Sequence, residues 1–213
     1  EISKVIGTDS RIGSKFLNTS VGFGGSCFKK DILNLVYISK SLGLNEVAKY
    51  WNQVIEINNH QQARFAKKII KNLFGTVSGK KITLFGWAFK KDTNDTRESA
   101  AIYIADKLIE EGAIVCVYDP KVNKQQIFND INHLDSRLES ENEELLKYFG
   151  DPYDACIESH AIAIVTEWDE FIDYDWNLIF EKSIKPASIF DGRNILKKNK
   201  VQSIGFNYFG TGK

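Results

Sequence analysis

The pattern of hydrophobic and polar positions changes along this 213-residue chain near Gly79. Before that point the spacing predicts a helix over about Phe28 to Ser41 that stops near Gly43. A second helix is predicted from Asn45, which can cap it, to Gly75, a length of about 45 Å. Such a helix is usually a spine or an oligomer contact, although a helix packed along its own domain would show the same apolar stripe. The stripe consists of Val47, Trp51, Val54, Asn58, Phe65, Ile69 and Leu73.

After Gly79 short apolar runs alternate with helical stretches. Strands predicted at 82–85 and 114–118 flank a helix at 98–111, which makes a βαβ unit with a parallel sheet. Residues 121–150 are predicted to be a polar insertion with a helix near 143–149. Further strands are predicted at 161–166, 188–190 and 201–207, and further helices at 152–158 and 176–183.

These elements predict an α/β fold in two parts. Residues 1–78 form a central helical, dimerising segment, which opens with the end of a helix and an irregular loop and contains the long spine helix. Residues 79–213 form a Rossmann-like, doubly wound parallel-sheet domain.

Composition and charge narrow the range of partners. The chain is 43% hydrophobic and 26% charged, as in soluble globular proteins, and its 28 basic residues balance its 28 acidic ones. We therefore expect no nucleic-acid or membrane partner, and no apolar run approaches the ~20 residues of a membrane span. Cys27, Cys116 and Cys156 are an odd number without close spacing, which argues against a disulfide framework or a zinc site. The three histidines form no visible ligand set, so we expect no metal, and the cysteines favour a reducing, cytoplasmic location.

The first candidate for chemistry is a glycine-rich loop at 22–25 that leads into a helix at Cys27. A thiol at a helix N-terminus is a candidate nucleophile, because the helix dipole and the two lysines that follow favour the thiolate. Asp31 would lie one turn on, on the same face, where a carboxylate suits acid or base catalysis. The plainer alternative is a common turn with a small buried cysteine, and composition alone favours it.

The second candidate lies at the end of the first predicted strand, at 86–91, in the place of a phosphate-binding turn. Ligands of open α/β sheets bind beyond the carboxyl ends of the strands. We therefore expect convergence there of Phe89, Lys90, Thr166, Glu167 and Arg193. A single glycine of the GxGxxG pattern weakens the case for NAD in this domain. Asp119 stands where a ribose-binding acid would sit, but about 33 residues after Gly86 rather than roughly 20, and its alternative role is in a simple turn.

Three segments taken together resemble the UDP-glucose 6-dehydrogenase family: GGSCFKKD at 24–31, FKKDTNDTRES at 89–99 and FDGR at 190–193. The resemblance covers essentially the whole chain. It implies an NAD-dependent, two-step oxidation of UDP-glucose to UDP-glucuronate through a cysteine thiohemiacetal and thioester, with Cys27 and Asp31 as catalytic residues.

Family members carry an N-terminal dinucleotide-binding domain ahead of the cysteine segment. This chain starts at Glu1 and has no methionine, so we expect a piece of a longer protein whose NAD is bound mainly elsewhere. We expect this chain alone to bind UDP-sugar weakly and not to turn it over.

The resemblance also implies the roles of other residues. Substrate contacts fall on Phe16, Phe23, Gly24, Phe28, Phe89, Lys90 and Arg193, and on Arg11 reaching across a dimer interface to the neighbouring subunit's sugar nucleotide. Cofactor contacts fall on Lys30 and Arg97. Asn18 stands where relatives often have lysine, and the long helix would form the dimer or a higher oligomer. Without the resemblance, Arg11 would be an ordinary surface arginine and the 91–99 loop a helix-capping run.

Two other functions stay open from the sequence. One is a related sugar-nucleotide dehydrogenase acting on GDP-mannose or a UDP-N-acetyl sugar, although those relatives commonly show proline shortly after the cysteine, where this chain has Phe28-Lys29. The other is a non-catalytic nucleotide-binding or oligomerisation module.

Overall fold

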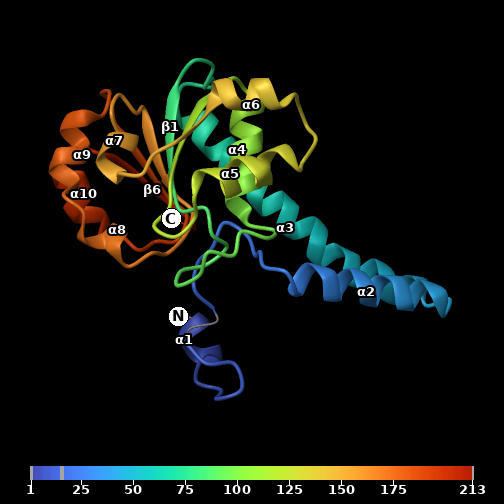
Figure 1. Cartoon of the computed structure of the whole chain (residues 1–213). Coiled ribbons are helices and arrows are strands. Elements are labelled where there is room, and N and C mark those ends of the chain that lie inside the picture. The colour runs from blue at the N-terminus through green and yellow to red at the C-terminus, as the bar shows by residue number, and fades with distance from the viewer. Residues whose placement is uncertain (1, 15–16, 213) are drawn as a thin grey trace.

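A computed structural model describes residues 2–14 and 17–212 and shows a helical hairpin projecting from an α/β domain (Figure 1). After a short helix α1 (Ile2–Ile6), the hairpin consists of α2 (Phe28–Ser41) and α3 (Asn45–Asn72). The turn between them is tight because Gly43 adopts φ +74° and the Leu44 N–H donates to the Ser39 carbonyl at 2.8 Å.

The long helix begins where the sequence predicts. Its predicted cap is wrong: Asn45 is already the first helical residue, and the N-cap position falls on Leu44, which makes no side-chain cap. The C-terminal half of α3 packs against α4 (Ala100–Glu110) and buries Phe65, Ala66 and Ile69. The α2 end of the hairpin stands clear of the α/β domain (Figure 1). Helix α3 is therefore a spine that joins the two parts of the molecule.

The described residues form a sheet of six strands, all parallel, in the order β3-β2-β1-β4-β5-β6. The chain enters at the centre, builds one half outward and then crosses to build the other, so the fold is doubly wound with its switch point between β1 and β4. Most strand residues are buried, as expected of a sheet covered on both faces. The strands are β1 (Lys81–Phe85), β2 (Ile114–Tyr118), β3 (Leu146–Tyr148), β4 (Ala161–Ile164), β5 (Ser188–Asp191) and β6 (Asn207–Gly210).

Two predicted elements are wrong. The insertion at 121–150 is two helices, α5 (Lys124–Asn132) and α6 (Glu139–Leu145), followed by the edge strand β3 in place of the helix predicted at 143–149. This strand has a weak hydrophobic pattern because it is three residues long and exposes Lys147. The strand predicted at 201–207 is mostly helix α10 (Lys198–Ile204), which ends where Gly205 takes φ +124°, and β6 follows.

Helices cover both faces of the sheet (Figure 1). Helices α4, α5 and α6 lie on one side, and α7 (Pro152–Ala155), α9 (Trp176–Lys182) and α10 lie on the other, with α8 (Glu170–Asp173) below them. Phe85, Trp87, Phe171 and Phe190 are fully buried between these layers. None of the described helices combines the length and the apolar character needed to cross a membrane. The loops after β1, β4 and β5 leave the sheet at one edge and meet the segment that precedes α2.

Candidate active site

The loop before α2, called here the cysteine loop (residues 20–27), is anchored to the spine helix. The Phe23 N–H donates to Asn58 Oδ1 at 2.8 Å, and Asn58 Nδ2 donates to the Phe23 carbonyl at 3.1 Å. Gly22 takes φ +136° beside this amide, and a Cβ there would lie 2.9 Å from Gln62 Cγ. Asn58, a polar residue within the predicted apolar stripe, is therefore the clamp that positions the loop.

The cysteine loop rests on the loop that follows β1. The Gly25 N–H donates to the Arg97 carbonyl at 2.8 Å, and a Cβ on Gly24 would lie 2.4 Å from the Glu98 carbonyl oxygen. A Cβ on Gly25 would lie 3.0 Å from the Phe89 ring. The two glycines thus permit a close approach between two segments of the chain.

Cys27 occupies the N-cap position of α2 and is exposed, whereas Cys116 and Cys156 are buried. The Asp31 N–H donates to the Cys27 carbonyl at 2.8 Å, so Asp31 lies one helical turn along, and it is also exposed. The structure therefore places the two predicted catalytic residues next to each other on an accessible helix end. Burial raises the pKa of the Cys116 thiol to about 11 and that of Cys156 above its ordinary value as well.

The FDGR turn after β5 touches the other side of the cysteine loop. Buried Asp191 fixes the turn by accepting from the Arg193 N–H at 3.1 Å, the Leu196 N–H at 2.9 Å and the Tyr208 hydroxyl at 3.1 Å. A Cβ on Gly192 would lie 2.2 Å from Val21, and Arg193 donates to the Ser20 hydroxyl at 2.6 Å. All three sequence motifs therefore meet at the cysteine loop.

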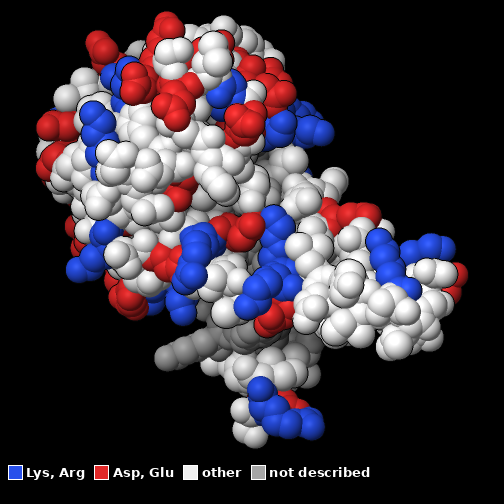
Figure 2. Space-filling view, turned by 45° about the vertical axis from the view of Figure 1, so that its right-hand side comes forward, with Lys and Arg blue, Asp and Glu red and all other residues white. Residues whose placement is uncertain are grey.

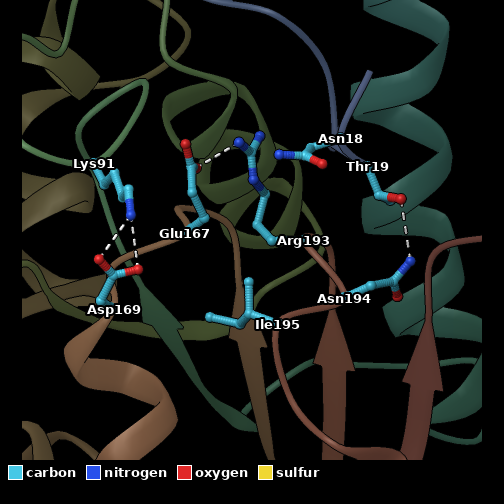
Figure 3. Close-up of a pocket in the computed structure, with 8 residues that line it drawn as sticks. All are labelled: Asn18, Thr19, Lys91, Glu167, Asp169, Arg193, Asn194 and Ile195. Carbon is cyan, nitrogen blue, oxygen red and sulfur yellow. Dashed lines mark hydrogen bonds and ion pairs between the residues drawn. The ribbon is translucent and has the colours of Figure 1, made fainter. Parts of the chain in front are cut away.

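Arg193 also projects into a cavity of about 590 Å³ (Figure 3). Its Nη2 lies 2.5 Å from Glu167 Oε2, and Arg193 Nε has no hydrogen-bond partner among the described residues. Burial lowers the pKa of Arg193, opposed by the nearby Glu167 and Asp191 carboxylates. On the opposite side, Lys91 Nζ pairs with Asp169 at 2.7 Å. The lining residues are Asn18, Thr19, Lys91, Glu167, Asp169, Arg193, Asn194 and Ile195.

The predicted convergence beyond the strand ends is only partly met. Glu167 and Arg193 come together, but Lys90 is exposed, with its Nζ 5.3 Å from the Phe89 ring centroid, and Lys91 lines the cavity in its place. Thr166 is buried and donates its hydroxyl to the Ala88 carbonyl at 2.7 Å, so it holds the backbone and is not available to a ligand.

A second cavity, of about 640 Å³, lies on the α4 side of the cysteine loop and brings together the two predicted cofactor residues. Arg97 and Lys30 are exposed there, and Arg97 donates to Asp95 at 2.8 Å. This hydrogen bond raises the pKa of Arg97, and the charge of Asp95 adds to the shift. The lining residues are Ser26, Lys30, Arg97, Glu98, Ile102, Tyr103, Asn129, Asp130, His133 and Leu134.

Other predicted residues lie elsewhere. Arg11 is 86% exposed, pairs with Asp9 at 2.6 Å and is not among the residues that line either cavity. Phe16 lies outside the described residues. The two Asp119 oxygens accept from four backbone N–H groups and from the Trp168 indole, so this carboxylate holds the ends of β1 and β2 and is a turn residue, not a ribose ligand.

The roles of several residues that shape this region do not follow from the sequence pattern. By the sequence pattern, Asn58 is a position in the stripe of the long helix, and Glu98 is a carboxylate in the first turn of the helix predicted at 98–111. Lys91 and Asp169 belong to loops whose pairing depends on the sheet order. A polar residue inside an apolar stripe was the one available signal, at Asn58.

Comparison with known proteins gives two family matches. Residues 1–60 match the central domain of the UDP-glucose/GDP-mannose dehydrogenase family, and residues 83–198 match the UDP binding domain of the same family. UDP-glucose 6-dehydrogenases of Gallus gallus and Drosophila melanogaster are 53% and 52% identical to this chain over 215 and 214 residues. Each alignment covers 100% of the chain and 44% or 45% of the relative, so the chain spans about half the length of the curated relatives it matches. A solved UDP-glucose dehydrogenase from the archaeon Pyrobaculum islandicum is 27% identical with a TM-score of 0.71, over 98% of this chain and 42% of that one.

Proposed function

Because the chain belongs to the UDP-glucose/GDP-mannose dehydrogenase family, we propose that it is the cysteine-bearing and UDP-sugar-binding part of an NAD-dependent UDP-glucose 6-dehydrogenase. The observation that carries this proposal is the meeting of three distant motifs at the cysteine loop, through the contacts of Gly25 with Arg97 and of Arg193 with Ser20. Residues 1–78 then supply the thiol and the subunit contact, and residues 79–213 supply the UDP site.

The substrate site is proposed at the carboxyl edge of the sheet. Arg193 offers a planar fork of donors to a diphosphate or sugar, and Lys90 adds a second cation. Aromatic side chains supply the nonpolar wall: Phe89 lies against Gly25, and Phe23 meets Phe28 edge to face with ring centroids 4.6 Å apart. Because Gly24 has no side chain, the cysteine loop can lie close to the loop that carries Phe89. Arg11, which is exposed in this chain, is proposed to serve a neighbouring subunit's site, and Phe16 is the remaining residue proposed to contact the substrate.

The proposed chemistry converts the C6 alcohol of UDP-glucose into a carboxylate. The first oxidation gives an aldehyde, and the Cys27 sulfur adds to its carbonyl carbon to form a thiohemiacetal. The second oxidation removes a hydride from that carbon and leaves a thioester. Water attacks the thioester, releases the carboxylate and returns the thiol, while Asp31 assists the proton transfers. Covalent capture keeps the reactive aldehyde in place between the two oxidations.

NAD⁺, when bound, accepts one hydride in each oxidation. The residues of this chain proposed to face it are Lys30 and Arg97. Both line the second cavity beside Ser26, and their charges suit a pyrophosphate. The hydrogen bond from Gly25, two residues before Cys27, to the Arg97 carbonyl supports a cofactor position next to the thiol.

Self-association is proposed through the hairpin. In Figure 2 the hairpin extends to the right of the domain with a broad uncharged surface. Its exposed apolar side chains are Leu33, Leu35, Tyr37, Ile38, Leu42, Leu44, Val47, Tyr50 and Ile57. Exposed apolar side chains gathered on one projecting element favour a protein contact. A charged substitution on this surface, Tyr50→Glu, should lower the mass in light scattering, whereas an unchanged mass would argue against this interface. The three free thiols support a cytoplasmic location.

Ligand-dependent thermal stability tests the proposed function. UDP-glucose should raise the melting temperature of the chain, because a ligand that binds the folded state adds RT ln(1 + [L]/Kd) to its stability. GDP-mannose at the same concentration should raise it less. Equal shifts with both, or a shift with neither, would contradict the proposal. Arg193→Lys, which keeps the charge and removes the fork, should reduce the UDP-glucose shift.

A further inference from the structure

A cluster of three polar side chains ties the first turn of α2 to the start of α4. Lys29 Nζ lies 2.6 Å from Glu98 Oε2, and the Tyr103 hydroxyl donates to the same carboxylate oxygen at 2.5 Å. Lys29 Nζ also lies 3.4 Å from the Tyr103 oxygen and 5.5 Å from its ring centroid. The Lys29 and Glu98 side chains are 27% and 35% exposed, so the pair is partly shielded from water.

The backbone around Glu98 bears directly on the cysteine loop. Glu98 takes φ +54°, a left-handed conformation that costs a non-glycine residue about 1 kcal/mol. Its carbonyl oxygen is the atom that a Cβ on Gly24 would strike, and the neighbouring Arg97 carbonyl accepts from Gly25. The Glu98 side chain then reaches Lys29, two residues past Cys27. Main chain and side chain together hold the loop on both sides of the thiol.

The charges of this pair are stable near neutrality. Burial disfavours both charged forms, but the hydrogen bond to Glu98 raises the pKa of Lys29, and the hydrogen bonds from Lys29 and Tyr103 lower the pKa of Glu98. One carboxylate oxygen of Glu98 already accepts from two donors, Lys29 and Tyr103, so the three side chains bind one another. Glu98 and Tyr103 also line the second cavity, and their hydrogen bonds with Lys29 tie that wall of the cavity to the first turn of α2.

We propose that Lys29, Glu98 and Tyr103 are positioning residues that fix Cys27 against the loop that carries Phe89 and Arg97. This rests on the proposed function in one respect, that Cys27 is the nucleophile. The cluster acts on the reaction through the placement of the thiol beside Arg97 and at the end of α2. A loosened loop would move the sulfur away from the N-terminus of α2, where Cys27 is the N-cap residue, and make it less reactive.

The test is the rate of Cys27 alkylation by iodoacetamide in the folded chain, because the other two cysteines are buried. Lys29→Met, Glu98→Gln and Tyr103→Phe should each slow alkylation, the first two by about threefold, which is within the range expected of a partly exposed ion pair. Lys29→Arg should restore the parent rate. Lys40→Met removes an exposed lysine from the last turn of the same helix and should leave the rate unchanged.

The sign of the change in alkylation rate distinguishes a positioning role from a direct electrostatic effect on the thiol. Removing a cation at Lys29 and an anion at Glu98 would change thiol reactivity in opposite directions if each acted through space alone. Slowing by both variants supports the positioning role, whereas opposite changes, or rates equal to the parent, overturn it. Melting temperatures measured alongside confirm that each variant is folded at the assay temperature.

The same alkylation assay also tests the proposed function independently. UDP-glucose should protect Cys27 of the parent chain from alkylation if the sugar nucleotide binds beside the thiol. Absence of protection would contradict the proposed substrate, while the comparison among the unliganded variants would still decide the role of the cluster.

Discussion

The side-chain amide of Asn58 binds both polar backbone groups of Phe23, accepting from its N–H at 2.8 Å and donating to its carbonyl at 3.1 Å. This one side chain replaces a short piece of strand pairing, and it connects the spine helix to the loop that presents Cys27. Because the loop has no regular structure of its own, its position depends on such contacts.

Replacing Asn58 should therefore loosen the cysteine loop. Asn58→Ala leaves two backbone groups of Phe23 without partners in a half-buried place and should lower the free energy of unfolding by about 1–3 kcal/mol in urea titrations. Asn59→Ala, one position along the same helix and exposed, is the matched control and should change stability by less than about 0.5 kcal/mol. Equal effects of the two variants would rule out the clamp.

A methyl group at Gly24 should disturb the contact between the two loops. Its Cβ would lie 2.4 Å from the Glu98 carbonyl oxygen, so the backbone must move, and we expect Gly24→Ala to lower the melting temperature by several degrees, equivalent to ~1–3 kcal/mol. Gly150→Ala serves as the control because a Cβ there meets nothing within 4 Å. A Gly24 variant as stable as the parent would mean that the loops are not held together in solution.

Arg193 should dominate the affinity for UDP. Arg193→Lys keeps a positive charge but loses the fork and the hydrogen bond to Ser20, and we expect UDP to bind about tenfold more weakly by calorimetry, or ~1.4 kcal/mol. Lys185 precedes the opposite, amino end of β5, and the Lys185→Arg variant should bind UDP as the parent does. Unchanged affinity in Arg193→Lys would remove this residue from the substrate site.

The stabilising effect of the Lys29–Glu98 pair should fade in acid. The pKa of Glu98 in the folded chain lies below its ordinary value of 4.5, so its contribution is present above that value and is lost as the pH falls through the lower, folded pKa. The difference in unfolding free energy between the parent and Glu98→Gln should be largest near neutral pH and should shrink below about pH 4. A difference that stays constant across this range would show that the carboxylate charge contributes nothing.

The three thiols should differ sharply in reactivity. In the folded chain one cysteine, Cys27, should react with an aromatic disulfide reagent within minutes at about pH 8, and Cys116 and Cys156 should react only after denaturation. Burial explains the difference, since it raises the pKa of Cys116 to about 11. The Cys27→Ser variant should show no fast phase, and a fast phase that persists in it would place the reactive thiol elsewhere.

Periodicity predicted the parts of the fold whose stability is local. Helix α2 and strand β2 have the predicted bounds because their apolar residues repeat with a clear period. Strand β3 could not be found, since three residues at a sheet edge have too little pattern and pair only because β2 is beside them. Helix α10 was hidden because Val201 and Ile204 fit a short strand as well as a helix, and Gly205 decides between them.

The same distinction between local pattern and distant contacts applies to the candidate site. Cys27 and Asp31 were recognisable because one helical turn separates them in the sequence. The neighbours of Arg193 were not, because Ser20 and Glu167 reach it from distant segments. Lys91 in place of Lys90 at the cavity shows that the exact direction of a loop side chain depends on its ion-pair partner, here Asp169, which spacing does not encode.

The hydrogen bond between Ser20 and Arg193 spans 173 positions of the chain. During synthesis the cysteine loop is among the first of these segments to leave the ribosome, yet its last supporting contact cannot form until the FDGR turn has followed and β5 has joined the sheet. Cys27 is therefore synthesised early, but the last contact that holds its loop forms late. In a growing chain the loop lacks its contact with Arg193, so its final position depends on completion of the sheet.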